Sequence, residues 1–194
     1  MSRQLELWGE SPERHNVFFA VRPNDPAASG IAGISQELAT SRGMIAHILP
    51  PERLHVTLSA VGEFAGALPS KVIEAAELGA DSVLMAPFTV VFDRVVTFGG
   101  GRGRRPLVLV GGDGATGLLR LHDALSLALM KAGVKAVGGG AFTPHMTLMY
   151  TDATCDIPIA PISWTVDAFA LIDSLIGQTT HRVMRQWSLR GPTG

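Results

Sequence analysis

Residues 52–64 read ERLHVTLSAVGEF, and residues 142–150 read FTPHMTLMY. Both stretches contain the order His, apolar, Thr, apolar: His55-Val56-Thr57-Leu58 in the first and His145-Met146-Thr147-Leu148 in the second. In an extended segment, residues i and i+2 project to one face and the residues between them to the other. We therefore expect each strand to bury its apolar pair and to present His and Thr together. If both pairs meet at one ligand, two imidazoles can act as acid and base and two hydroxyls can hold an oxyanion.

The composition is that of a globular protein. A chain of 194 residues with 46% hydrophobic and 17% charged side chains predicts a single domain over residues 1–194. Its two halves are expected at about 14–85 and 86–190, and an exchange of strands between them is left open. A formal net charge of −1 argues against binding to duplex DNA or other long duplexes, but permits a small or terminal phosphate substrate.

The chain has no apolar run long enough for a membrane span, and its N-terminus is polar and charged, so we expect a cytoplasmic protein that does not enter membranes. The single cysteine, Cys155, excludes an internal disulfide, and we expect it to have no role in the chemistry.

The hydrophobic pattern predicts strands and helices in both halves. The first helix is expected to start at Asp25 as N-cap with Pro26 as its first residue, and Gly43, Gly79 and Gly133 are expected to end the three helices. The predicted strands are 16–22, 53–58, 88–98, 106–110 and 145–150, the helices are 25–42, 69–78 and 118–129, and a closing hairpin is formed by 163–175 and 181–189.

Glycine-rich and basic segments lie between these elements. The glycines in 99–103 and 111–114 match neither the Walker spacing nor the dinucleotide fingerprint, so they are expected to form turns, and those in 138–140 lie in a predicted loop. Two basic runs either are solvent-exposed or face a phosphate: Arg102, Arg104 and Arg105, and His181, Arg182, Arg185 and Arg190.

Two other kinds of site compete for the histidines. A zinc site is disfavoured because neither strand offers a third ligand at a recognised spacing, and Asp152 and Glu63 lie beyond the strand ends. A serine or cysteine nucleophile is disfavoured because no nucleophile-elbow sequence is present and no cysteine lies beside either histidine. The pattern thus favours two histidines that flank a phosphodiester without a metal.

With these motifs and their flanks, the chain resembles the two-histidine phosphoesterases. The resemblance is to the bacterial and archaeal 2′-5′ RNA ligase branch, also described as RNA 2′,3′-cyclic phosphodiesterases. It implies an α+β fold of two pseudo-symmetric βα lobes, with antiparallel sheets that face a central cleft, helices outside, and neither metal nor cofactor. Besides the two motifs, it rests on the stretches NVFFAVRPND, RRPLVLV, LHDALSLALMKAGV and LIDSLIGQTTHRVMRQWSL.

The resemblance implies a catalytic site of His55, Thr57, His145 and Thr147. The expected reaction opens a 2′,3′-cyclic phosphate, at an RNA end or on a small nucleotide, to a 2′-phosphate, with 2′-5′ ligation as the reverse type of displacement. The family favours His145 as base and His55 as acid, although the symmetry of the two motifs leaves the order open. A monomer is expected.

One position departs from the pattern of many relatives. Where these have an arginine two residues after the second motif, this chain has Tyr150, whose hydroxyl and ring offer a hydrogen bond and a stacking surface in place of a cation. The other candidate substrate-binding residues are Arg105, Arg182 and Phe19. Two alternative functions stay open: a non-catalytic module that binds RNA ends or nucleotides, and a hydrolase of another cyclic or 2′-5′ linked nucleotide.

Overall fold

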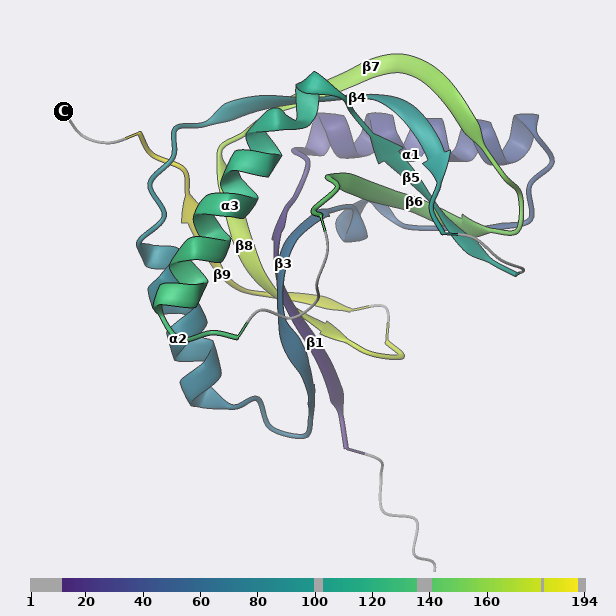
Figure 1. Cartoon of the computed structure of the whole chain (residues 1–194). Helices are drawn as coiled ribbons and strands as arrows, with labels where there is room; N and C mark the ends of the chain where they lie inside the picture. The colour runs from purple at the N-terminus through teal and green to yellow at the C-terminus, as the bar shows by residue number, and fades with distance from the viewer. Residues whose placement is uncertain (1–11, 100–102, 136–140, 179, 192–194) are drawn as a thin grey trace, which may run out of the picture.

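The computed structural model describes residues 12–99, 103–135, 141–178 and 180–191, which fold into two antiparallel sheets and three α-helices (Figure 1). This confirms the predicted α+β class. The four-stranded sheet has the order β3 (Val56–Ala65), β1 (Arg14–Val21), β8 (Ala168–Leu175) and β9 (His181–Ser188). The five-stranded sheet has the order β2 (Ala46–Ile48), β6 (His145–Thr151), β5 (Arg105–Val110), β4 (Phe88–Thr97) and β7 (Asp156–Val166).

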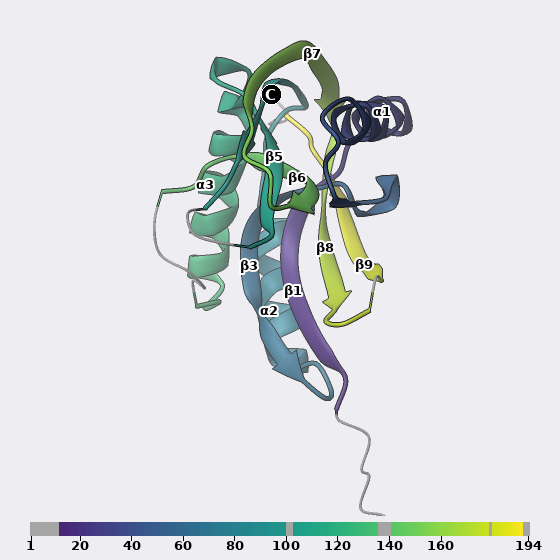
Figure 2. The same cartoon turned by 90° about the vertical axis from the view of Figure 1, so that its right-hand side faces the viewer.

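The helices cover the outside of the sheets, as expected. Helix α1 (Asp25–Ser41) contacts β6 and β7, whereas α3 (Thr116–Lys131) contacts β3 and β4. Helix α2 (Ser70–Asp81) packs against α3 and also contacts β9. Figure 2 shows α1 and α3 on opposite sides of the molecule, with the strands between them.

The helix ends differ from the prediction at two points. Asn24, not Asp25, caps α1, because its side chain accepts a hydrogen bond from the backbone N–H of Ala27 at 3.0 Å. Gly79 does not end α2, which continues to Asp81. A Cβ at Gly79 would lie 3.2 Å from the carbonyl oxygen of Ala128 in α3, so the missing side chain permits the close approach of the two helices.

The strand prediction needs three corrections. The expected strand 53–58 begins only at Val56, because Pro51–Arg53 form a short 3-10 helix, and it continues to Ala65 as β3. The expected strand 163–175 is two strands, β7 and β8, which Asp167 separates and which belong to different sheets. The first half of β7 could not be recognised from the sequence, because it reads IPIAP. Proline cannot donate a hydrogen bond to a sheet and therefore argues against a strand. The short strand β2 was not predicted, whereas the β8–β9 hairpin is confirmed.

Both faces of the four-stranded sheet bury apolar side chains, but the two buried clusters differ greatly in size. One face belongs to the main core, which extends through both sheets and the helices. The other carries a small buried cluster of Phe18, Ala20, Ala170 and Ile172. Of the predicted glycine turns, Gly111 and Gly114 pack so closely against Val91 that a Cβ would collide with it, while Gly100, Gly101, Arg102 and Gly138–Gly140 lie outside the described residues.

Candidate active site

Both His-x-Thr motifs have the predicted alternation. Val56 and Leu58 of β3 are buried, while Thr57 and His55, which directly precedes the strand, are half-buried. The second motif repeats this pattern in β6, with Met146 and Leu148 fully buried or nearly so, and His145 and Thr147 half-buried. Within the described part of the chain, neither threonine hydroxyl has a hydrogen-bond partner, so both hydroxyls can donate to a ligand.

The two histidines are held by the same backbone contact. The Nδ1 atom of His55 lies 2.7 Å from the carbonyl oxygen of Arg53, and the Nδ1 atom of His145 lies 2.7 Å from that of Thr143. A carbonyl oxygen only accepts hydrogen bonds, so Nδ1 carries the proton in each ring. Each Nε2 can therefore accept a proton when the ring is neutral and donate one when it is charged.

The strands that carry the motifs belong to different sheets, but β3 and β6 contact each other. His122 of α3 links them further. Its Nδ1 donates to the carbonyl oxygen of Leu58 at 2.7 Å, and its ring stacks on Phe142, just before the second motif, with centroids 4.1 Å apart. The pattern of alternation gave no signal for this link.

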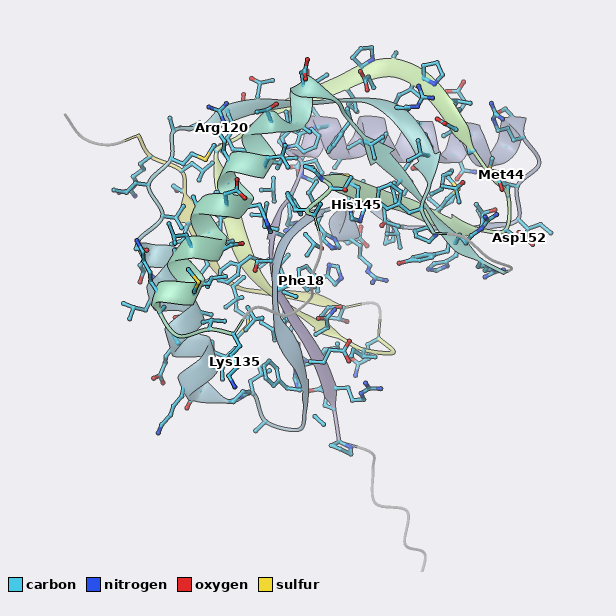
Figure 3. The ribbon with its side chains drawn as sticks, viewed as in Figure 1. Phe18, Met44, Arg120, Lys135, His145 and Asp152 are labelled. Atoms are coloured by element: carbon cyan, nitrogen blue, oxygen red, sulfur yellow. The ribbon has the colours of Figure 1, made fainter. Side chains whose placement is uncertain are left out.

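An aromatic cluster surrounds His55. The ring of Phe18 from β1 stacks on it at 5.0 Å, and His181 from β9 meets it edge-on at 5.1 Å. Figure 3 shows Phe18 on the four-stranded sheet and His145 at the start of β6. Phe98, directly after β4, packs against the second histidine as Phe18 packs against the first, and the ring centroids of Phe98 and His145 are 4.7 Å apart.

The charge around His55 disfavours its protonation. Burial lowers the pKa of His55, and the positive charges of Arg53, His145 and Arg22 lower it further, against the opposing effect of the Arg53 carbonyl. Burial also lowers the pKa of His181 to about 4, together with the charges of His55, Arg53 and Arg22. Both imidazoles are therefore neutral near pH 7 in the unliganded protein.

Three of the predicted substrate-binding residues lie away from the motifs. Phe19 is completely buried and packs against Phe169 and Trp187 in the main core, so the prediction is off by one residue and Phe18 is the phenylalanine beside His55. The guanidinium of Arg105 donates to the carbonyl of Asp152 and the hydroxyl of Thr154, which fastens the turn after β6.

Arg182 is the third predicted substrate-binding residue that lies away from the motifs. Neighbouring residues of a strand point to opposite faces, so Arg182 points away from the face of β9 that carries His181. It lies opposite Asp173 in the sheet, and its guanidinium is 3.7 Å from Glu13. The cations near His55 are instead Arg22 and Arg53, which lie outside the two basic runs in the sequence.

Tyr150 lies on the same face of β6 as His145 and Thr147 because the strand is irregular. The register slips at Leu148, between the pairs Val108–Thr147 and Leu107–Met149. Leu148 and Met149 are consequently both buried, and Tyr150 is 41% exposed, opposite His47 of β2.

The described residues contain no group of three His, Cys, Asp or Glu side chains placed to hold a metal ion. Among the same residues, no helix is both long and apolar enough to cross a membrane.

Comparison with solved structures supports the assignment of the fold. The apo form of E. coli LigT matches with a TM-score of 0.70 at 23% identity, over 92% of this chain and 99% of that chain. TT0787 of Thermus thermophilus matches with a TM-score of 0.69 at 23% identity, over 92% of this chain and 100% of that chain. E. coli LigT complexed with 3′-AMP matches with a TM-score of 0.66 at 24% identity, over 91% of this chain and 99% of that chain.

The fold and the paired motifs are those of the two-histidine phosphoesterases. The model of the family described as the 2′-5′ RNA ligase superfamily matches residues 23–177, and the chain belongs to this superfamily. A comparison with curated protein sequences finds no match.

Proposed function

We propose that this protein is a metal-independent RNA 2′,3′-cyclic phosphodiesterase that opens a terminal cyclic phosphate to a 2′-phosphate. The observation that carries the proposal is the matched pair of histidines, each with Nδ1 donating to the carbonyl two residues earlier and with Nε2 available. Membership of the superfamily supports a phosphoesterase activity. Reversible 2′-5′ ligation, in which a 5′-hydroxyl replaces water, uses the same groups.

The phosphodiester lies between the two motifs in this proposal. One neutral imidazole takes a proton from the attacking water at Nε2 while the water oxygen bonds to phosphorus. The bond from phosphorus to the 3′ oxygen breaks, and the other imidazole, protonated, delivers its Nε2 proton to that oxygen. Thr57 and Thr147 donate hydrogen bonds to the non-bridging oxygens, and these strengthen as negative charge accumulates in the transition state.

The surroundings of His55 favour it as the base. A base must be neutral before the reaction, and burial with nearby positive charge lowers the pKa of His55. His145 is then the acid. This order is the reverse of the one that the family resemblance favours.

The substrate is proposed to be a nucleotide or an RNA end. Structures of E. coli LigT in complex with 3′-AMP and with ATP support a nucleotide ligand. Tyr150 offers an exposed ring on the face of the motifs, where it can stack on a base. We further propose that the protein acts as a monomer in cytoplasmic RNA processing.

A turnover assay tests the proposal. Wild-type protein with excess chelator should convert a nucleoside 2′,3′-cyclic phosphate to the 2′-phosphate, and H55A and H145A should each lose roughly 10²–10⁴-fold in kcat. Nucleotide binding without turnover would leave the alternative of a binding module. Activity that chelation abolishes and metal restores would contradict the mechanism.

The order of acid and base needs a second substrate, in which sulfur replaces the bridging 3′ oxygen. A thiolate leaves without a general acid, so this substrate should restore most of the rate of H145A while H55A stays slow. Restoration of H55A instead would assign the acid to His55.

A further inference from the structure

A small cavity is lined by His181, whose ring meets that of His55 edge-on with centroids 5.1 Å apart. It has a volume of about 100 Å³, roughly three times the share of one molecule in liquid water. Such a space suits a phosphate group better than a nucleobase. Its lining residues are Arg22, Glu52, Arg53, Ile172, His181 and Val183.

The cavity is lined by two guanidinium groups, for which the described part of the chain provides no ion-pair partner. The terminal nitrogen of Arg53 is 3.5 Å from Nε2 of His181, and its Nε is buried without a hydrogen-bond partner in the described structure. Among the described residues, Arg22 donates only to the backbone carbonyl oxygen of Glu52, at 3.3 Å. Neither guanidinium is within salt-bridge distance of a carboxylate among the described residues, although Glu52 lines this cavity and Asp25 lines the neighbouring one.

These groups match the chemistry of a phosphate. A guanidinium presents several N–H donors in a fixed plane, and phosphate oxygens accept them in a bidentate manner. The apolar side chains of Ile172 and Val183 reduce solvation of the cavity, which strengthens its attraction for an anion.

We propose that Arg22, Arg53 and His181 form a subsite for a second phosphate group of the substrate. The inference rests on the proposed function, since it places the cyclic phosphate at His55 and His145 and the second phosphate beside His55. This phosphate is the 5′-phosphate of the terminal nucleotide, either as a monoester or as the diester to the preceding nucleotide. Arg22 also lines two cavities of about 310 and 280 Å³, which leave room for the preceding nucleoside.

The experiment compares kcat/KM for three substrates: a nucleoside 2′,3′-cyclic phosphate with a 5′-hydroxyl, the same compound with a 5′-phosphate, and a dinucleotide ending in the cyclic phosphate. Wild type should prefer at least one of the two-phosphate substrates by roughly 10-fold to 100-fold, as expected for hydrogen bonds to a charged group. A preference for the 5′-phosphorylated compound would show that the subsite binds a phosphate monoester, and a preference for the dinucleotide would show that it binds a diester. R53Q and R22Q should each lose most of it.

The matched control is R182Q. Arg182 is next to His181 in sequence but faces away from it towards Glu13, so this variant should keep the preference. Each preference is a ratio of kcat/KM values for two substrates on the same enzyme. Any effect of Arg53 on the reactivity of His55 changes both values equally and cancels in this ratio. Equal kcat/KM values in wild type, or an unchanged ratio in R53Q and R22Q, would overturn the subsite.

Calorimetric titration separates this inference from the proposed reaction. A nucleoside 2′,5′-bisphosphate should bind wild type at least 10-fold more tightly than the 2′-monophosphate, and R53Q should remove the difference. If no cyclic phosphate is hydrolysed but this difference is found, the proposed reaction fails and the subsite stands. If turnover is found and the affinities are equal, the subsite alone fails.

Discussion

His181 should make the stability of the protein depend on pH in the acidic range. Its pKa is lowered from 6.5 to about 4 in the folded state, by burial and by the positive charges of His55, Arg53 and Arg22. As the pH falls below 6.5, the unfolded chain takes up a proton at this residue before the folded protein does. The folded state therefore loses stability as the pH falls from 6.5 to about 4, and His181 adds no pH dependence above that range.

The size of the effect follows from the shift. Lowering the pKa from 6.5 to about 4 corresponds to about 3 kcal/mol, at roughly 1.4 kcal/mol for each tenfold change in the equilibrium. Because His181 is only partly buried, solvent screening reduces the expected value to about 1–2 kcal/mol.

Urea unfolding at several pH values tests this prediction in wild type and H181N. Wild type should lose about 1–2 kcal/mol more than H181N on going from neutral pH to about pH 4. His47, exposed on β2, provides the control H47N, which should have the pH dependence of wild type. If H181N and wild type lost stability in parallel, the reasoning about burial and positive charge at His181 would be refuted.

Three further predictions concern the pH profile, Tyr150 and a buried hydrogen bond between His15 and Asp173. The ascending limb of kcat/KM should have its midpoint below pH 6.5, because the pKa of the proposed base His55 is lowered, and a midpoint at or above 6.5 would contradict that role. Tyr150→Ala should raise KM about 10-fold with little change in kcat, whereas Tyr150→Phe should resemble wild type, if the ring stacks on a base. Asp173→Ala should lower the free energy of unfolding by about 1–3 kcal/mol, because it leaves the Nδ1 atom of the buried His15 without the carboxylate 3.0 Å away. No measurable loss in urea unfolding would show that this hydrogen bond is unimportant.

The parts of the fold that follow local patterns could be predicted from the sequence. The alternation in both motifs predicts which side chains are buried, and the burial of Val56 and Met146 agrees with it. Helix periodicity and glycine stops predict α1 and α3, and positive φ angles at Gly43 and Gly133 confirm the stops.

The remaining site residues depend on pairing between distant strands. The run NVFFAVR is apolar at nearly every position, so alternation does not reveal that Phe18 rather than Phe19 lies beside His55. His181 reaches the site because β9 joins β8, and β8 joins β1, in the four-stranded sheet. Tyr150 lies on the face of the motifs only through the irregularity at Leu148.

The most direct test of the central claim is a crystal structure with a nucleoside 2′,3′-cyclic vanadate, which mimics the five-coordinate phosphorus of the transition state. We expect the vanadium between the two motifs, with Nε2 of His55 and Nε2 of His145 each about 2.6–3.2 Å from oxygens on opposite sides of it. Both threonine hydroxyls should donate to the remaining oxygens. Vanadate bound elsewhere, or in contact with only one of the two histidines, would contradict the two-histidine mechanism.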